Sequence, residues 1–424
     1  MSQIITTRLI ISKMRLKTTL LESEGTMNKE ERLQIAKKHC FFIGLNDSGA
    51  ELCKANIVYG IAGIHYIQNQ LGLSPNATFI STSDMTITRN TNRWGSGFGY
   101  GGKISWGAGD NDLIILNTKP NACGMLVGGL EKPPDIESLI KKLHEIETGT
   151  IEIDGIEVIW EFYKSNHFID VFRVKLVTKL DHNLPPYAFI IHGSADEFRG
   201  DNESGFGIYY DKSKQLREIA ERIETPLGEF HILTGSGARE YFERYQCAEN
   251  FSKKKRKVAA ELLFGKFIEI SNETHQGLIN MNEIVLGCHY LKNRTTLFPV
   301  TLRADLPAYL VKGNPNLSSE SVELLGFEKR AKSLGVYDRL LNANIIPHGG
   351  GYVLPDILTV NKVIEVDGER YFEVEMQNDR GKKIISEVRE LPYEYRGRKV
   401  MLRALEIGSI EIVAKLIPQY VLKI

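Results

Sequence analysis

Three histidines and one cysteine stand in the sequence where a folded chain could present metal ligands. His167 (KSNHFIDV), His192 (FIIHGSADEFRG) and His289 (IVLGCHYLKN) each lie at or beside the end of an apolar, strand-like run that leads into a turn. Cys123 (KPNACGMLVGG) follows the apolar run DLIILN. Rigid strands present side chains at their ends, and neutral imidazoles with a thiolate are usual ligands for zinc, manganese or iron. The pattern predicts a metal site, with hydrogen-bonded structural histidines and a buried apolar cysteine as the alternative.

A fourth histidine, His348, lies in the glycine-rich string IPHGGGYVLPD. Small glycines would let a phosphate approach its ring and the surrounding backbone N–H groups. The alternative is a glycine-rich turn that carries an exposed histidine.

Basic and aromatic residues that could meet a nucleic acid occur in two places. Arginine and tryptophan beside a phosphate-binding loop suit backbone contact and base stacking, although core tryptophans and solvated lysines need no ligand. The string KKKRKV also matches a nuclear-import signal, but its place inside a helix favours a solvated or RNA-facing stripe. These residues are Arg93, Trp94, Lys103, Trp106 and the run from Lys253 to Lys257.

The elements expected to position these groups form a mixed pattern, which predicts an α+β fold. Residues 1–26 are expected to be a loose arm or the product of an upstream start codon, and 27–424 a single large domain. A glycine-rich stretch, 94–112, must turn tightly or approach another group closely. Helices are predicted at 28–39, 135–146 and 237–265, strands at 151–160, 168–176 and 187–191, a β-rich segment at 361–386, and a final helix followed by a strand.

Composition limits the class of protein and its surroundings. Lys+Arg and Asp+Glu each number 53, so a polyanionic partner would have to meet a local basic patch. Five scattered cysteines favour a reducing compartment, by default the cytoplasm. No apolar run approaches the roughly 18 residues of a membrane span, so no membrane partner is expected.

Several short motifs, in one order along the chain, resemble the RtcB-type RNA-splicing ligase family. Asn166-His167-Phe168 resembles that family's Asn-His-Phe, and Ile191-His192-Gly193-Ser194 its Ile-His-Ser-Gly-Ser loop. Collinear matches over most of a chain are not expected by chance. The other similar segments are Ala122 to Met125, GSGFGYGG at 95–102, YLVKGNPNLSSES at 309–321 and the terminal IPQYVLKI.

The resemblance implies an RtcB-like domain with mixed β-sheets around a central metal pocket. It implies an enzyme of RNA splicing and repair that joins an RNA 3'-phosphate or 2',3'-cyclic phosphate to a 5'-hydroxyl. GTP and Mn²⁺ (Zn²⁺ being possible) would be its cofactors, acting through a covalent histidine–guanylate. Carried over by position, Cys123, His167, His192 and His289 match metal ligands, and Asn166 and Lys423 match residues that contact the guanine nucleotide.

The sequence departs from the family at three places. A metal-binding aspartate is replaced by Pro120, the polar Asp-x-His-x-Gly motif reads Thr91 to Gly95, and the nucleophile motif His-Gly-Ala-Gly-Arg falls on Leu325 to Lys329. Leucine cannot form a phosphoramidate, so His348 is the candidate for a displaced nucleophile. Two alternatives stay open: a catalytically impaired pseudoenzyme that binds RNA ends or nucleotide, and a metal-dependent phosphoesterase.

Overall fold

The chain builds one eleven-stranded sheet from strands far apart in the sequence. The computed structural model describes residues 27–162, 166–178, 184–314, 317–378 and 381–422. The sheet comprises β1 (Cys40–Phe41), β2 (Thr78–Thr86), β3 (Tyr100–Ser105), β5 (Cys123–Leu130), β8 (Phe168–Leu176), β9 (Tyr187–Gly193), β12 (Ile268–Asn280), β13 (Glu283–Leu286), β15 (Leu297–Val300), β16 (Ala308–Gly313) and β23 (Ile410–Leu422).

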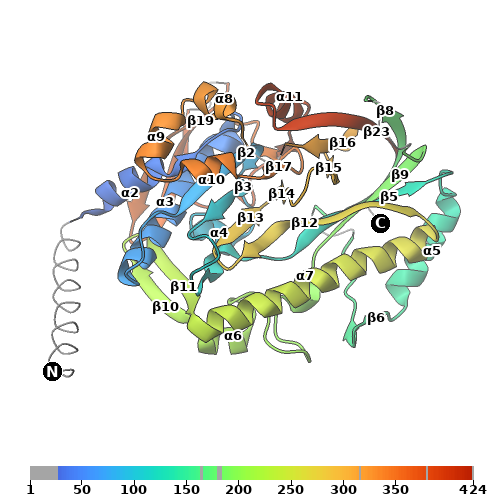
Figure 1. Cartoon of the computed structure of the whole chain (residues 1–424), viewed down its shortest axis with the longest axis horizontal. Helices are drawn as coiled ribbons and strands as arrows, with labels where there is room; N and C mark the ends of the chain where they lie inside the picture. Colours follow the sequence, from blue (N-terminus) through green and yellow to red (C-terminus); the bar gives the residue numbers. More distant parts are fainter. Residues whose placement is uncertain (1–26, 163–165, 179–183, 315–316, 379–380, 423–424) are drawn as a thin grey trace, which may run out of the picture.

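The spatial order of these strands is β1-β2-β3-β13-β12-β5-β9-β8-β23-β16-β15. Only β1 and β2 run parallel; the other neighbours pair antiparallel. Strands from the beginning and the end of the described chain therefore share one sheet (Figure 1).

Smaller sheets complete the β-structure. Two have three strands: β4 (Leu113–Ile115) with β10 (Glu221–Thr225) and β11 (Gly228–Thr234), and β19 (Ile357–Val366) with β20 (Glu369–Met376) and β21 (Lys382–Ile385). Three have two strands: β6 (Glu152–Ile153) with β7 (Ile156–Glu157), β14 (Cys288–Tyr290) with β17 (Ile345–Pro347), and β18 (Tyr352–Val353) with β22 (Glu394–Tyr395).

Helices lie on both sides of the large sheet (Figure 1). The long helix α7 packs across β5, β9 and β12, while α3 packs against β2 and β19. The mixture of helices with a large sheet agrees with the predicted α+β class. The helices are α2 (Lys29–Lys38), α3 (Ser48–Gln70), α4 (Thr91–Gly95), α5 (Ile136–Thr148), α6 (Lys214–Ile219), α7 (Gly235–Phe264), α8 (Ser319–Leu324), α9 (Glu328–Ser333), α10 (Tyr337–Leu341) and α11 (Lys399–Glu406).

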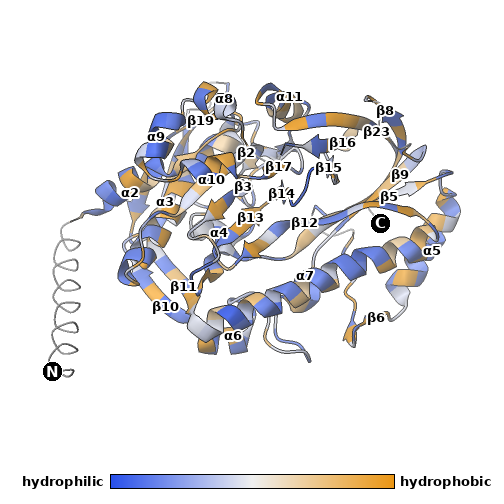
Figure 2. Ribbon diagram, in the orientation of Figure 1, coloured by the Kyte–Doolittle hydropathy of each residue, from blue (hydrophilic) through white to orange (hydrophobic). Residues whose placement is uncertain are grey.

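Helix α7 turns an apolar stripe toward the sheet, as its sequence period predicts. Tyr241, Tyr245, Ala248 and Phe251 are among its buried residues, and hydrophilic and hydrophobic residues alternate along it (Figure 2). The basic run does not form a continuous solvated stripe, because Lys255 and Arg256 fall on the buried face. The other three lysines pair with carboxylates: Lys253 with Glu249 and Glu273, Lys254 with Asp154, and Lys257 with Glu269.

Most predicted elements are confirmed at nearly the expected bounds, but the strand predicted at 151–160 is wrong. It is a short hairpin, β6 and β7, whose turn places Asp154 and Gly155 at φ values of 53° and 79°. An Asp-Gly pair favours a turn with both residues in the left-handed region, so the run reverses instead of extending.

The tryptophan and lysine side chains of the glycine-rich stretch are buried in the protein interior. Trp94 lies against Phe372, and the Trp106 indole donates to the carbonyl of Leu113. Lys103 is buried and pairs with Glu283. These three side chains therefore pack in the interior, which is the alternative to nucleic-acid contact that the sequence left open.

Membrane-spanning helices are not found in the part of the chain that the structure describes, since none is both long and apolar enough.

Candidate metal centre and phosphate pocket

Four neighbouring strands of the large sheet bring four metal-ligand side chains together. Cys123 begins β5, His192 lies near the end of β9, His167 directly precedes β8, and His275 lies in β12. These strands are adjacent in the order β12-β5-β9-β8. The register places His192 opposite Met125 on one side and Phe168 on the other. The sheet therefore gathers side chains that the sequence separates by up to 152 residues.

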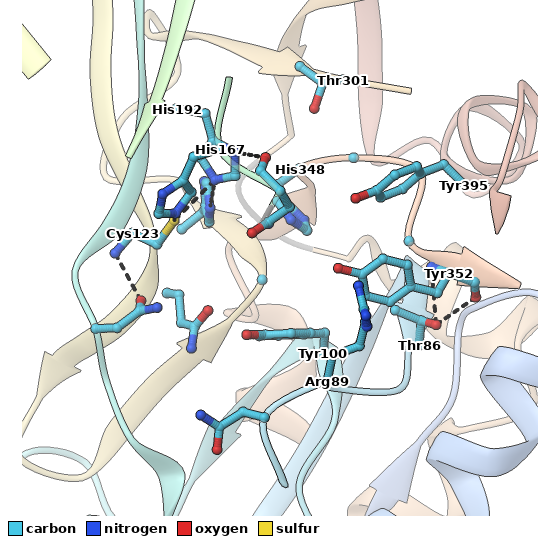
Figure 3. A pocket seen from close by; sticks show the side chains of 18 of the residues that line it. Thr86, Arg89, Tyr100, Cys123, His167, His192, Thr301, His348, Tyr352 and Tyr395 are labelled. Atoms are coloured by element: carbon cyan, nitrogen blue, oxygen red, sulfur yellow. Dashed lines mark hydrogen bonds between the residues drawn. The ribbon is translucent and has the colours of Figure 1, made fainter. Parts of the chain in front are cut away.

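The side chains converge on the cysteine sulfur (Figure 3). The Cys123 Sγ lies 3.0 Å from His192 Nε2 and 3.6 Å from His167 Nε2. His192 Nε2 lies 3.2 Å from His275 Nε2, and the ligand atoms of Cys123, His192 and His275 all lie within 4.8 Å of one another. A thiolate with imidazoles at this spacing is a donor set suited to a transition metal.

The neutral state of His192 and His275, together with the orientation of His192, fits this role. Burial, followed by the neighbouring histidines, lowers the pKa of His192 and His275 well below the usual value, so both rings are neutral. The Nδ1–H of His192 donates to the carbonyl of Asn166 at 3.0 Å, which leaves Nε2 for a metal. Burial also acts to lower the pKa of His167, but the adjacent Glu161 carboxylate and Cys123 raise it to about 10.

His348 stands beside this group, held by a buried aspartate. Its ring centroid lies 4.6 Å from that of His275. The Asp84 Oδ2 atom accepts from His348 Nδ1 at 2.8 Å and from the backbone N–H groups of His348 and Gly349 at 3.0 and 3.2 Å. Although burial by itself raises the pKa of Asp84, hydrogen bonds from His348 and Thr82 hold that pKa below its usual range. The carboxylate fixes Nδ1 as the protonated nitrogen, so Nε2 is available for chemistry.

Glycines let the loop after His348 pack against Arg396. Gly351 has a φ of 67°, and a Cβ on it would lie 2.5 Å from Arg396 Nη1; a Cβ on Gly350 would lie 2.6 Å from the Arg396 carbonyl. Arg396 is buried and binds both carboxylate oxygens of Asp47 at 2.6 Å. This ion pair therefore fixes the loop that carries His348.

Replacing Arg396 with methionine is expected to lower the free energy of unfolding by about 3 kcal/mol, because it leaves Asp47 without its cation. Urea denaturation of the variant measures this loss. Arg398→Met removes an exposed arginine two residues away and is expected to cost under about 0.5 kcal/mol. Equal unfolding midpoints for the two variants would contradict the assigned role.

The residues predicted from the sequence are distributed as follows. Cys123, His167, His192 and His348 meet in one site, and Asn166 lines the same pocket. His289 lies next to the group, with its ring centroid 5.7 Å from that of His275, but its Nε2–H donates to the carbonyl of Pro299 at 2.7 Å. Lys423 lies outside the described residues, and Val421 of β23 lines the pocket.

Leu325, on which the family's nucleophile motif falls, lies away from this pocket. It follows α8 and packs in a core cluster with Val322 and Phe327. His348 comes 23 residues later, after α8, α9 and α10 have been completed between β16 and β17. The helices α9 and α10, followed by β17, occupy this separation in sequence.

The histidines open onto a cavity of about 730 Å³, a size that suits a small molecule such as a nucleotide. Tyr100, Tyr352 and Tyr395 lie on the side of the cavity across from Cys123 and His192 (Figure 3). Cationic side chains in the lining outnumber the carboxylates of Asp170 and Asp211. The cationic residues are Arg89, Arg93, Lys119, Arg199, Lys212, Arg303 and Arg389.

Two residues of the site, His275 and Asp84, were not predicted from the sequence. His275 lies within the polar string SNETHQG, whereas the three histidines predicted as metal ligands each lie at or beside the end of an apolar run. Asp84 had a usable signal: it is a carboxylate within TFISTSDMT, a strand whose nine residues are all buried. Buried carboxylates require partners, so such an aspartate indicates a site.

No protein-family model matches the chain, and no curated protein matches it with significance.

Proposed function

We propose that the protein is an RNA ligase similar to the RtcB type, with residues 27–424 as one catalytic domain. Its substrates would be an RNA end bearing a 3'-phosphate or 2',3'-cyclic phosphate and a second end bearing a 5'-hydroxyl. GTP would supply the energy for joining. The free cysteines, Cys40, Cys53, Cys123, Cys247 and Cys288, agree with a reducing compartment such as the cytoplasm.

The observation that carries this proposal is the position of His348. Although the motif in which the family keeps its nucleophile falls on Leu325, His348 lies in the pocket beside the cysteine–histidine group. A histidine with Nδ1 held by a buried carboxylate presents Nε2 as a nucleophile and can stabilise positive charge on its ring.

The donor set supports a divalent metal at Cys123, His192 and His275, with His167 beside them. The resemblance favours Mn²⁺, while sulfur and nitrogen donors also suit Zn²⁺. A bound metal would withdraw charge from phosphoryl oxygens.

The pocket lining supports binding of a nucleotide and an RNA end. Arg and Lys side chains offset phosphate charge, and tyrosine rings such as Tyr395 offer stacking surfaces for a base. In the first step His348 Nε2 would attack the α-phosphorus of GTP. An N–P bond forms, the α–β anhydride bond breaks, and pyrophosphate leaves. Asp84 would keep the Nδ1 proton in place and offset the positive charge of the substituted ring.

The test is incubation of the full chain with GTP, Mn²⁺ and two labelled RNA strands, one with a 3'-phosphate and one with a 5'-hydroxyl. A joined strand that depends on GTP is the expected result. Binding of RNA or nucleotide without joining would identify a pseudoenzyme. Loss of the terminal phosphate without joining would identify the metal-dependent phosphoesterase instead.

Replacing Asp84 with asparagine is expected to slow formation of the guanylate adduct by about 10³-fold. The amide carries no charge to stabilise the substituted imidazole, and it does not fix the ring tautomer. Single-turnover labelling with radioactive GTP measures the rate. Thr82→Val is the control: it removes the hydroxyl that bonds Asp84 Oδ1 at 2.5 Å but leaves the bonds of Oδ2 to His348 intact. Its rate is expected to fall less than tenfold, and an equally small effect of Asp84→Asn would contradict the role of this carboxylate.

A further inference from the structure

A buried group of charged side chains adjoins His167 of the candidate metal centre. Glu161 and Lys255 are each 1% exposed, and Glu197 is also buried. The Lys255 Nζ atom lies 3.3 Å from Glu161 Oε1 and 2.9 Å from Glu197 Oε1. Burying these charges is costly unless each has defined partners.

Glu161 connects this group to the metal centre. Its Oε2 atom lies 3.3 Å from His167 Nδ1, while Nε2 of the same ring lies 3.6 Å from Cys123 Sγ. One ring nitrogen therefore faces the carboxylate and the other faces the proposed metal ligands. A carboxylate that accepts from the outer nitrogen of a ligating histidine fixes its tautomer and orientation.

The carboxylate is itself held from two elements. The backbone N–H of Ser194, next to β9, donates to Glu161 Oε1 at 2.7 Å, and the Ser194 hydroxyl lies 3.1 Å from the same oxygen. Lys255 approaches from α7 and also donates to the Ser194 carbonyl at 3.3 Å. The β9 strand carries His192, so the same contacts tie Glu161 to a second ligand of the site.

We propose that Glu161 is a positioning residue of the metal centre, which orients His167 toward Cys123 and is anchored by Lys255. This inference rests on the proposed metal site. Lys255, which belongs to the basic run of α7, would then balance the charge of the carboxylate that holds a metal ligand. This role differs from the RNA contact that the basic run suggested.

The test is titration of the full chain with Co²⁺ alone, followed by the near-ultraviolet absorption of a cobalt–thiolate bond. Glu161→Gln is expected to raise the Co²⁺ dissociation constant by about tenfold or more. Glu197→Gln is the matched control, since it also removes a buried carboxylate from Lys255, and the Glu197 Oε1 atom that meets Lys255 accepts from the backbone N–H of Ile159. Its dissociation constant is expected to stay within about twofold of the unsubstituted protein.

The outcomes separate positioning from a purely structural role. Equal Co²⁺ affinities for Glu161→Gln and the unsubstituted protein, or equal losses in both variants, would overturn the inference. If Glu161→Gln does not fold, the double variant Glu161→Gln with Lys255→Met removes one anion and one cation together, and it should show the same loss of affinity. Failure of the unsubstituted protein to bind Co²⁺ would overturn the metal site and this inference together, whereas normal binding in both variants would overturn the inference alone.

Discussion

Replacing His348 with alanine is expected to abolish the covalent guanylate, lowering the yield of adduct and of joined RNA by at least about 10³-fold. Removing a catalytic nucleophile has effects of this size or larger, because no water molecule can replace the covalent step. His348 lines the cavity with its Nδ1 held by Asp84, which leaves Nε2 as the nitrogen that can attack. Labelling with GTP and Mn²⁺, followed by denaturing electrophoresis and peptide mass mapping, measures the adduct and its position.

The control for this experiment is His144→Ala, which removes an exposed histidine from α5. His144→Ala should keep the unfolding temperature of the parent, whereas His348→Ala is expected to lower it, because the buried Asp84 loses its side-chain partner and keeps only its bonds from Thr82 and from the backbone N–H groups of residue 348 and Gly349. An adduct that persists in His348→Ala, or that maps to another residue, would refute the proposed nucleophile. If the parent protein forms no adduct, the ligase proposal fails and the binding or hydrolytic alternatives take its place.

Sequence periodicity predicted the local elements of this fold better than their arrangement. Helix α7 and strand β8 carry an apolar pattern strong enough to define them without tertiary information. The order of strands in the sheet depends on contacts across the chain, such as the pairing of β23 with β8 and β16. No local pattern encodes that pairing, and the resemblance to a known family supplied only an expectation for it.

The candidate site was predictable where a ligand follows or ends an apolar run. His192 lies near the end of β9, and Cys123 begins β5 a few residues after the apolar run DLIILN; both lie in the centre. His275 does not, because it lies inside β12 among polar residues and meets Cys123 only through strand pairing. His289 also satisfies the local condition, but its Nε2–H donates to the carbonyl of Pro299, so only Nδ1 would remain to bind a metal. A strand-end histidine is therefore a candidate ligand, and its neighbours in the sheet decide its role.

Replacing Cys123 with serine is expected to weaken metal binding by at least about 100-fold and to remove the cobalt–thiolate absorption. A hydroxyl is a poor ligand for a soft metal, and changes to groups behind a ligand already cost ten- to a hundredfold. Cys123 is central because both His192 and His167 approach its sulfur. RNA joining should fall with metal occupancy, and the two quantities can be compared over a range of Mn²⁺ concentrations.

Cys247→Ser provides the matched control, since Cys247 is an exposed cysteine on α7. It should keep both the metal affinity and the absorption of the parent. Serine and cysteine differ little in volume, so a similar thermal stability in both variants is expected and would separate ligand loss from misfolding. If Cys123→Ser binds Co²⁺ as tightly as the parent, the sulfur is a packed core group, and the metal must be held elsewhere. That result would also remove the chemical reason for placing RNA-end chemistry at His348, because the nucleophile would then lack a metal beside it.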